Sequence, residues 1–398
     1  CSIAHITGAQ SGGASKRSQA VKILHTADWH LGKKIEGKSM LENQKAALSE
    51  LNDIACREGV DAIVIAGDVF DTAVPSSEAE QLFYSCCVAL SSPDRAVVAI
   101  AGNHDDEVRL CAARSLAKEH NVYLVGDADN SFFDGDKVKG GDGWLKISTS
   151  SGTLNLGLLP YRGQTGTAGG GDEYVRRVQS EMEKGASACA PGEVNVLAAH
   201  LFMLDGSEEK TLGGARILPS DILPSSASYV ALGHVHKCMR VCSAPPAYYS
   251  GSLVPCNFTE TQERCVKLVS FGDGGELLEV RDIALKKVKK LVKIPVANYK
   301  EAYDKLSECG DYAEIMYDCP DAVEPSAMAA LRAMPAFVKF TPCFVRSEEK
   351  SRGRKLMNDD QLFDAFYKSR YGSAPDDEEK LMFYKAVNGE ELYETDKT

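Results

Sequence analysis

The histidines of this sequence gather at one kind of position. The chain has eight histidines in 398 residues, and five of them follow short apolar runs that are typical of buried strands. Carboxylates and an amide occur in the same loops, in the ordered patterns DxH, GDxxD, GNHD, H and GHxH. A single histidine is more often structural than functional, but this ordered set indicates one shared site. Its members are Asp28, His30, Asp68, Asp71, Asn103, His104, Asp105, His200, His234 and His236.

These residue types are the ligands that a pair of divalent cations requires. Two ions held about 3.5–4 Å apart need a bridging carboxylate and several further ligands. Mixed nitrogen and oxygen ligation suits Mn²⁺, Fe²⁺ or Zn²⁺ better than Mg²⁺ or Ca²⁺. Asp28 and His30 stand two residues apart, so on an extended strand end both side chains are expected to point at one ion. The same spacing recurs in His234 and His236.

Three of the loops also contain a glycine directly before a candidate ligand. These are Gly67, Gly102 and Gly233. Because glycine has no Cβ, each of them allows a tight turn and a close approach of another backbone.

The elements that must position these loops form an α/β core. Five short apolar runs end at them, namely VKILHT, EGVDAIVIAGD, DRAVVAIAGNHD, VNVLAAH and SYVALGHVH. Helical patterns lie between the first three, at Leu41 to Arg57 and at Ser77 to Leu90. Alternating strands and helices predict a sheet flanked by helices, with functional groups where the strands end.

The remainder of the chain divides into further segments. The Gly-rich stretch over 163–172 predicts a mobile surface loop, and strands over 248–271 close the first domain. A smaller α+β unit follows, with strands at 289–295, 313–316 and 336–344 and helices at 298–309 and 324–334. The predicted division is a disordered extension over 1–20, a first domain over 21–280, a second over 281–345, and a linker with two amphipathic helices over 346–398. The apolar faces of those helices carry Leu362, Phe363, Phe366, Tyr367, Leu381 and Tyr384.

The composition excludes several classes of protein. With 44% hydrophobic and 26% charged residues the chain is expected to fold, and it lacks the run of about 18 apolar residues that a membrane-spanning helix needs. A net charge of −12 does not by itself suggest a nucleic-acid partner. Thirteen cysteines without a Cys-x-x-Cys pattern predict reduced thiols in the cytosol. A processed lipoprotein that begins at Cys1 is the alternative reading of the N-terminus.

Together the motifs resemble the calcineurin-like metallophosphoesterase superfamily. ILHTADWHLGKK, VDAIVIAGDVFDT, VAIAGNHD, YVALGHVHK and YSGSLVPCNFTE are similar to the bacterial SbcD nuclease subunits, from about Val21 to Phe271 and more weakly to the C-terminus. Protein Ser/Thr phosphatases are disfavoured, because GDVFDTA lacks the Arg that follows GDxxD in that family. Asp71 stands where archaeal and eukaryotic counterparts commonly carry His. The resemblance implies an α/β fold with a four-layer double-β-sandwich core, a small α+β capping domain and C-terminal helices.

The resemblance also implies a role for each site residue. The first metal would be held by Asp28, His30, Asp68 and His236, and the second by Asp68, Asn103, His200 and His234. His104 would lie over the scissile phosphate, where it stabilises charge or protonates the leaving oxygen. Asp71 and Asp105 would orient His104 or a ligand, although Asp71 could equally be a turn or cap residue. The expected cofactors are two divalent ions, most consistent with Mn²⁺.

The implied function is that of a metal-dependent DNA nuclease subunit. Members of the family act as 3′-to-5′ double-strand exonucleases and as single-strand and hairpin endonucleases in DNA repair, recombination and replication. They work as homodimers with SbcC, an SMC-like ATPase, and the absence of a GxxxxGK[ST] motif here means that any ATP dependence comes from that partner. The chain is expected in the cytoplasm, associated with the nucleoid. A phosphodiesterase for small molecules or cyclic nucleotides is the alternative.

Two accessory features of the sequence can each be interpreted in two ways. Lysines on the expected first strand of the cap could bind DNA phosphates, or they could protect a solvated edge strand from aggregation. They are Lys286, Lys287, Lys289 and Lys290, followed by Lys293. The C-terminal helices could bind SbcC, as in the family, or fold back onto their own core.

Overall fold

The computed structural model describes residues 20–163, 171–204, 211–212, 215–318 and 323–343, together with 363–364, 367–368, 374–376 and 379–380. The chain divides into two compact units, Cys1–Pro342 and Cys343–Thr398. Residues 1–19, most of the Gly-rich stretch over 163–172, the link over 346–355 and most of the two C-terminal helices lie outside the described residues. Among the residues that are described, no helix is both long enough and apolar enough to cross a membrane.

Two stacked sheets form the centre of the first unit. The first sheet has the order β17 (Leu277–Ala284), β16 (Cys265–Phe271), β1 (Lys22–Thr26), β4 (Ala62–Ala66), β5 (Ala96–Ile100) and β6 (Val122–Val125). The second has the order β14 (Met239–Ser243), β15 (Pro246–Tyr249), β13 (Tyr229–Gly233), β10 (Val194–His200), β9 (Thr153–Leu159), β8 (Trp144–Ser148) and β7 (Val138–Gly141). β1, β4, β5 and β6 are parallel, as are β9, β10 and β13.

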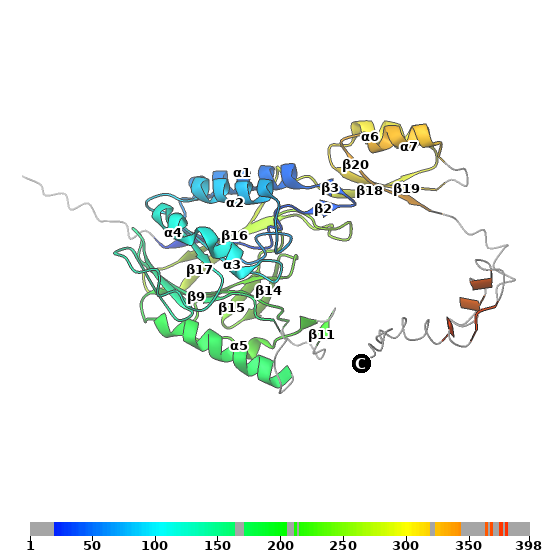
Figure 1. Cartoon of the computed structure of the whole chain (residues 1–398). Helices are drawn as coiled ribbons and strands as arrows, with labels where there is room; N and C mark the ends of the chain where they lie inside the picture. Colours follow the sequence, from blue (N-terminus) through cyan, green and yellow to red (C-terminus); the bar gives the residue numbers. More distant parts are fainter. Residues whose placement is uncertain are drawn as a thin grey trace, which may run out of the picture. The chain divides into compact units, whose positions relative to one another are not determined.

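Helices cover the outer faces of both sheets. α1 (Leu41–Glu58) and α2 (Ser77–Leu90) lie over the first sheet, and α5 (Gly171–Gly185) lies over the second (Figure 1). Short helices α3 (Glu107–Leu110) and α4 (Arg114–Ala117) follow β5. This is the predicted four-layer α/β sandwich, so the expected fold class is confirmed.

The central strands are apolar on both faces because both faces are buried. In β1, Ile23 packs between the two sheets while Leu24 packs toward the helices. In β4, Val64 packs between the two sheets and Ile65 packs toward the helices, since successive side chains of a strand point to opposite faces. The continuous apolar runs in the sequence therefore follow from the sandwich.

A small parallel sheet forms the second part of this unit. It has the order β18 (Leu291–Val296), β19 (Tyr312–Tyr317) and β20 (Phe337–Pro342), with α6 (Tyr299–Glu308) and α7 (Pro325–Arg332) packed on one face. This βαβαβ order was predicted. Leu291, Tyr312 and Val338 pack against Ile35 and Met40. Ile35 belongs to β2 (Lys34–Ile35), and Met40 directly follows β3 (Lys38–Ser39), the strand that pairs with β2.

Some elements differ from the expectations. β7, β8, β9 and α5 were not predicted; they lie within residues 131–192, a segment richer in Gly and polar residues than the rest of the first domain. β17 continues to Ala284, so the expected boundary at 280 falls inside a strand of the first sheet. The expectation that Lys286, Lys287, Lys289 and Lys290 lie on a strand was wrong, because β18 begins only at Leu291 and these lysines lie on the connection before it.

Candidate metal centre

The candidate site forms where loops from both sheets meet. The loops after β1, β4 and β5 all begin at the same end of the first sheet, because these strands are neighbours and run parallel to one another. In the second sheet, His200 ends β10 and pairs in register with Gly233 at the end of β13. The loops of the first sheet are also joined directly. The backbone N–H of Asp28 donates to the carbonyl of Gly67 at 3.0 Å, and that of His30 donates to Asp68 at 3.0 Å.

Several candidate ligands have an unusual backbone conformation. The φ angles are 53° at Asp28, 45° at His30, 49° at Asp68 and 106° at His234. L-residues rarely adopt positive φ, and such residues cluster at functional sites. The expectation that Asp28 and His30 lie on an extended strand end was therefore wrong. β1 ends at Thr26, and left-handed turns aim the two side chains instead.

The three glycines permit the close packing of these loops. A Cβ at Gly67 would overlap the imidazole of His200, and one at Gly233 would overlap the carbonyl oxygen of Ala66. A Cβ at Gly102 would overlap Asp68. Any side chain at these positions would therefore push the loops apart, as the sequence analysis anticipated.

Asp68 occupies the centre of the cluster. Its Oδ2 atom lies 3.6 Å from Nε2 of His30 and 3.5 Å from Nε2 of His200. Its other oxygen, Oδ1, accepts the backbone N–H of His104 at 2.9 Å. Asp68 is 2% exposed, and the surrounding imidazoles hold the pKa of its carboxyl below the usual value although burial opposes this. One carboxylate oxygen therefore faces a histidine of each expected metal site.

The spacing of the other ligand atoms fits divalent ions. Nε2 of His30 lies 3.0 Å from Nε2 of His236. Oδ1 of Asn103 lies 3.0 Å from Nε2 of His200 and 2.8 Å from Nδ1 of His234. Ligand atoms that bind one ion at about 2.1 Å and at right angles are separated by about 3 Å. Each group therefore has the spacing of neighbouring ligands around a single ion.

The imidazoles are oriented by bonds on the side away from the centre. Nδ1–H of His200 donates to the carbonyl of Ala66 at 2.8 Å, and Nδ1–H of His236 donates to Oε1 of Glu260 at 3.1 Å. Nδ1 of His30, which lies 3.5 Å from Oδ1 of Asp71, forms no such bond to a described residue. Bonds of this type fix the tautomer and leave the inner nitrogen free to bind a metal. The donor set therefore fits the expected cations.

The electrostatics show why cations would be favoured here. Burial opposes protonation of His200, but Asp68 outweighs it and raises the pKa of this imidazole to about 9. Burial likewise opposes protonation of His236, while Cys256 and Glu260 raise its pKa to about 11. Burial raises the pKa of Asp28, whose carboxylate accepts the N–H of His234 at 2.9 Å. The cluster thus attracts positive charge, and metal binding would release protons from it.

His234 differs electrostatically from these two imidazoles. Burial and the positive charge of His200 lower the pKa of His234 to about 4. Its ring therefore stays neutral at ordinary pH, which is the form that binds a metal.

His104 lies at the side of this cluster. Its ring centroid is 4.8 Å from that of His30, and its Nδ1–H donates to the carbonyl oxygen of Asp71 at 2.9 Å. Ligand atoms of His30, Asp68 and His104 lie within 4.8 Å of one another. The Nδ1 bond leaves Nε2 available to a substrate.

Asp71 and Asp105 take different positions. The side chain of Asp71 faces His30 and forms an ion pair with Lys33 at 2.9 Å. Asp105 accepts backbone N–H groups from Val69 at 3.0 Å, and also from Phe70 and Gly102, both at 2.8 Å. Asp105 therefore holds the GDVFD and GNHD loops together. Asp71 acts differently, because its main-chain carbonyl contacts His104 while its carboxylate faces His30.

Some neighbours were missed by the sequence analysis. Glu260 contacts His236, and the rings of Tyr161 and Phe202 lie 6.4 and 5.7 Å from that of His234. YSGSLVPCNFTE, which ends at Glu260, was a signal for the first of these. His25 lies outside the cluster, with its ring bonded to Tyr229 and to the carbonyl of Leu232.

Comparisons with known proteins agree with this geometry. A family model described as calcineurin-like phosphoesterase matches residues 21–238. The SbcD component of the nuclease SbcCD from Bacillus subtilis is 32% identical over 397 residues, covering 93% of this chain and 99% of that protein. The protein of the same name from Rhodobacter capsulatus is 28% identical, covering 79% of this chain and 80% of its own. That of Escherichia coli K12 is 30% identical over 269 residues, covering 64% and 66%.

Proposed function

This chain belongs to the calcineurin-like phosphoesterase family, and within it to the SbcD nuclease subunits, and from this premise we propose that it is the metal-dependent DNA nuclease subunit of an SbcCD-type complex. Its reaction is the hydrolysis of DNA phosphodiester bonds, as a 3′-to-5′ double-strand exonuclease and a single-strand and hairpin endonuclease. Its setting is DNA repair, recombination and replication at the nucleoid. The observation that carries this proposal is the carboxylate oxygen of Asp68 between His30 and His200, at 3.6 and 3.5 Å.

Divalent metal ions belong to this family's chemistry. When bound, two such ions activate water and neutralise the charge of the phosphate. In our proposal the first is held by Asp28, His30, Asp68 and His236, and the second by Asp68, Asn103, His200 and His234. Mn²⁺ is the ion we favour, because mixed imidazole, carboxylate and amide ligation suits it better than Mg²⁺ or Ca²⁺.

The chain's own contribution is to orient groups around the phosphate. The main-chain carbonyl of Asp71 accepts a hydrogen bond from Nδ1–H of His104, which directs Nε2 of that ring outward. From there Nε2 can donate a proton or a hydrogen bond to the leaving oxygen. Asp105 keeps the two loops in register, because its carboxylate binds backbone N–H groups of both. Little other acid–base chemistry by side chains is required.

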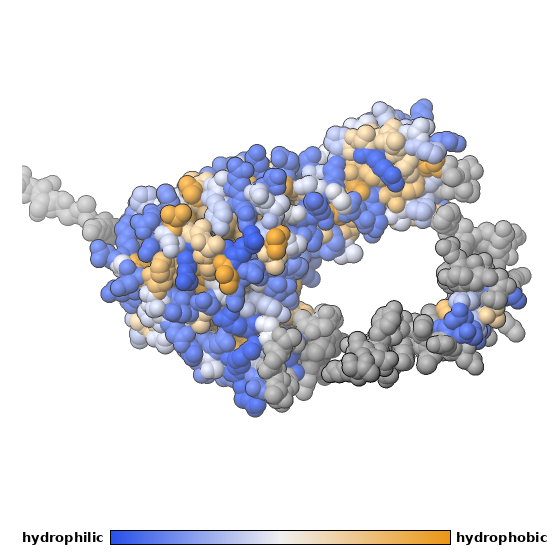
Figure 2. Space-filling model, in the orientation of Figure 1, coloured by the Kyte–Doolittle hydropathy of each residue, from blue (hydrophilic) through white to orange (hydrophobic). Residues whose placement is uncertain are grey.

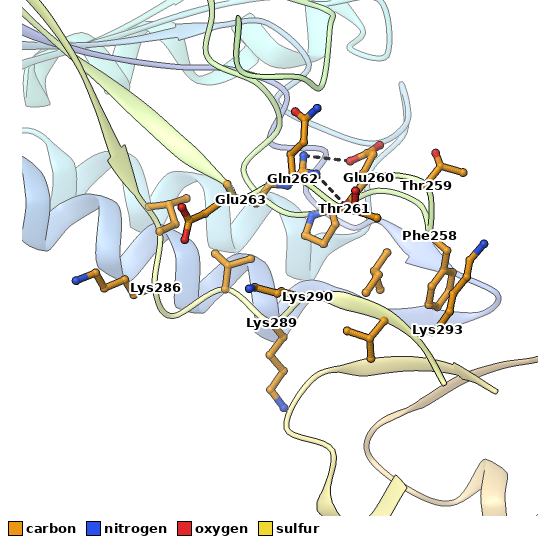
Figure 3. A pocket seen from close by; sticks show the side chains of 16 residues that line it. Phe258, Thr259, Glu260, Thr261, Gln262, Glu263, Lys286, Lys289, Lys290 and Lys293 are labelled. Atoms are coloured by element: carbon orange, nitrogen blue, oxygen red, sulfur yellow. Dashed lines mark hydrogen bonds and ion pairs between the residues drawn. The ribbon is translucent and has the colours of Figure 1, made fainter. Parts of the chain in front are cut away.

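The DNA path is proposed to pass the lysine-bearing connection before β18. A cavity of about 750 Å³ lies there, lined by Pro255, Phe258 to Arg264, Leu285, Lys286 and Val288 to Lys293 (Figure 3). It adjoins the metal centre through Glu260, which binds His236. Lysines line it on one side and can contact phosphates.

The four lysines are not equivalent in this role. Lys287 forms an ion pair with Asp53 at 2.8 Å, and the Lys289 ammonium lies 5.4 Å from the ring centre of Tyr312. All four lysines are exposed, but among the described residues neither Lys286 nor Lys290 has an ion pair or a ring contact at its ammonium. In Figure 3 the side chains of Lys286 and Lys289 point in different directions. Lys286 and Lys290 are therefore the stronger candidates for phosphate contacts.

Partners are proposed on two surfaces. The segment 346–398 binds the SMC-like ATPase SbcC. In the second unit, the Phe363 and Tyr367 rings lie 5.7 Å apart and Lys380 pairs with Asp364 at 3.0 Å.

A homodimer would use the helices after β4 and β5. Exposed apolar side chains occur there, with Val88 54%, Val108 76% and Leu116 75% exposed, and Figure 2 shows apolar residues among polar ones over α3 and α4.

The test is a cleavage assay with the full chain. With Mn²⁺ it should cut a DNA hairpin, EDTA should abolish cleavage, and re-added Mn²⁺ should restore it. The variant D68N should lose both activity and metal, because one residue serves both ions. Addition of SbcC and ATP should extend cleavage to double-stranded ends. Hydrolysis of only bis-p-nitrophenyl phosphate or cyclic nucleotides would overturn the nuclease proposal in favour of a small-molecule phosphodiesterase.

A further inference from the structure

A pair of thiols lies beside the metal centre but takes no part in it. The Sγ atoms of Cys238 and Cys265 are 2.7 Å apart, although the two residues are far apart in sequence. Cys238 directly precedes β14, and Cys265 is the first residue of β16. Both are free thiols and both are partly exposed to solvent. A small oxidant from solvent can therefore reach the Cys238 sulfur, which already touches the sulfur of the more buried Cys265.

A buried cation lies next to this pair. The ammonium of Lys267 is 3.1 Å from Sγ of Cys238 and 2.7 Å from Oδ1 of Asp282. Lys267 itself is only 2% exposed, and its ammonium also lies 5.0 Å from the centre of the Tyr248 ring. A lysine beside a sulfur stabilises negative charge on it and makes it a better nucleophile. Cys238 is therefore the sulfur expected to react first, with Cys265 in position to follow.

A metal site is the competing interpretation of the same residues. Cys238, Cys265 and Asp282 offer three ligand atoms within 4.8 Å of one another. The Lys267 ammonium, however, contacts both a sulfur and the carboxylate of this group. A fixed positive charge in that place repels a metal cation and occupies the ligand atoms. The geometry favours redox chemistry of the thiols over metal binding.

We propose that Cys238 and Cys265 are an oxidisable pair that forms an intramolecular disulfide when the protein meets hydrogen peroxide. The Cys238 sulfur attacks one peroxide oxygen, the O–O bond breaks, and a sulfenic acid and water result. The Cys265 sulfur then attacks the Cys238 sulfur and expels the hydroxyl group as a second water. The two thiols lose two electrons and two protons, and the peroxide is reduced to water.

The bond would close a loop that reaches the metal centre. Residues 239–264 lie between the two cysteines, and this segment includes Glu260, which accepts a hydrogen bond from His236. The guanidinium of Arg264, the residue before Cys265, also donates to the carbonyl of His236 at 3.1 Å. The disulfide would therefore fix the two ends of the segment that orients His236, and it would be reversible by thiol exchange.

The experiment uses the reduced full-length chain exposed to low concentrations of hydrogen peroxide. Peptide mapping without reductant should find one dominant cross-link, between Cys238 and Cys265, with the loss of two thiols per chain, and dithiothreitol should reverse it. In C265S the reaction should stop at a sulfenic acid on Cys238 that dimedone traps. C56S is the matched control, because Cys56 is an exposed thiol 3.7 Å from a guanidinium nitrogen of Arg95, and it should leave the cross-link unchanged.

Three results would overturn the proposal. One is oxidation spread over several cysteines without this cross-link. Another is a cross-link that forms equally fast in a chain unfolded by urea, because the folded contact would then have no role. The third is a bound zinc ion that both C238S and C265S lose. None of these results depends on nuclease activity, so the proposal can fail while the nuclease function stands.

Discussion

Nδ1 of His104 lies 2.9 Å from the main-chain carbonyl oxygen of Asp71, and this bond sets the direction of the catalytic candidate's ring. The side chain of Asp71 does something else, since its carboxylate faces His30 at 3.5 Å and Lys33 at 2.9 Å. One residue thus orients His104 through its backbone and places a negative charge beside His30, a candidate metal ligand, through its carboxylate.

Removal of the His104 ring should separate proton transfer from metal binding. In H104A we expect cleavage to fall by about 10²–10⁴-fold, the range for loss of a positioned acid, with the metal content unchanged. Rates on a DNA hairpin and the metal-to-protein ratio by elemental analysis measure the two effects. D71N is the informative companion, because it retains the carbonyl that holds His104 and should keep more activity. Loss of one metal equivalent in H104A would make His104 a ligand instead.

Glu260 should support metal binding through His236. In E260Q we expect metal affinity to fall by about 10–100-fold, as is usual when the partner of a ligating histidine is changed. Glu260 accepts from His236 at 3.1 Å and from the backbone N–H of Cys256 at 3.0 Å. E263Q is the matched control, because Glu263 lines the same cavity and should leave affinity unchanged. Calorimetric titration with Mn²⁺ compares them, and equal affinities in both variants would contradict the role of Glu260.

His25 should make the fold sensitive to mild acid. Burial, with a contribution from the positive charge of Lys267, lowers the pKa of His25 to about 3 from the ordinary value of 6.5. The unfolded chain therefore binds a proton below about pH 6.5 that the folded chain does not accept until about pH 3. Because the unfolded state binds more protons in that window, the free energy of unfolding must fall as the pH is lowered through it.

The size of this effect can be measured against a variant. Between pH 7 and 5, the His25 contribution is about 2 kcal/mol for a group whose unfolded pKa is about 6.5. H25Q removes the group that titrates at this position. Between pH 7 and 5 its free energy of unfolding should therefore fall by about 2 kcal/mol less than that of the unchanged chain, whatever its value at pH 7. Urea unfolding of both proteins at the two pH values provides the comparison. Parallel pH dependence of the two proteins would rule out the assignment.

The lysines before β18 should affect DNA binding through electrostatics alone. Each phosphate contact contributes about 0.9 to the slope of log K against log salt, so loss of Lys286 and Lys290 together should reduce that slope by about 1.8. The effect should not depend on DNA sequence. K287Q is the control, because Lys287 is neutralised by Asp53 at 2.8 Å and should change the slope less. Binding titrations by fluorescence anisotropy at several salt concentrations measure the slopes, and an unchanged slope in K286Q/K290Q would place the DNA elsewhere.

The C-terminal segment should be needed for the partner but not for the chemistry. Deletion of 350–398 should abolish co-purification with SbcC while hydrolysis of single-stranded DNA remains within about twofold of the full chain. The metal candidates all lie in the first unit, Cys1–Pro342, which is the reason for this expectation. Association that survives the deletion would place the SbcC contact elsewhere on the chain and refute this assignment. F363A/Y367A tests the same surface without truncation.

Much of the fold and most of the candidate site could be predicted from local features. Hydrophobic runs revealed β1, β4, β5, β10 and β13, because strands buried on both faces must be apolar throughout. The residue types at their ends indicated metal chemistry, since few other sites combine so many imidazoles and carboxylates. Gly67, Gly102 and Gly233 were informative for a similar reason, because a Cβ at any of them would overlap a neighbour. β7 to β9 and α5 were missed because the segment over 131–192 that contains them is rich in Gly and polar residues as a whole. Within it β9 is largely apolar, and α5 carries Tyr174, Val178 and Met182 at helical spacing on its buried face.

Orientation, in contrast, depended on contacts between distant parts of the chain. The ring of His200 is fixed by the carbonyl of Ala66, and that of His104 by the carbonyl of Asp71. Every residue carries such a carbonyl, so no residue type in the sequence marks the ones that matter. The left-handed turn at Asp28 likewise appears only when the loop bonds to Gly67, and the contact of Cys238 with Cys265 only when β16 lies beside the GHVH loop. Residue types establish which chemistry is available to the chain, but the packing of two sheets decides which atoms meet.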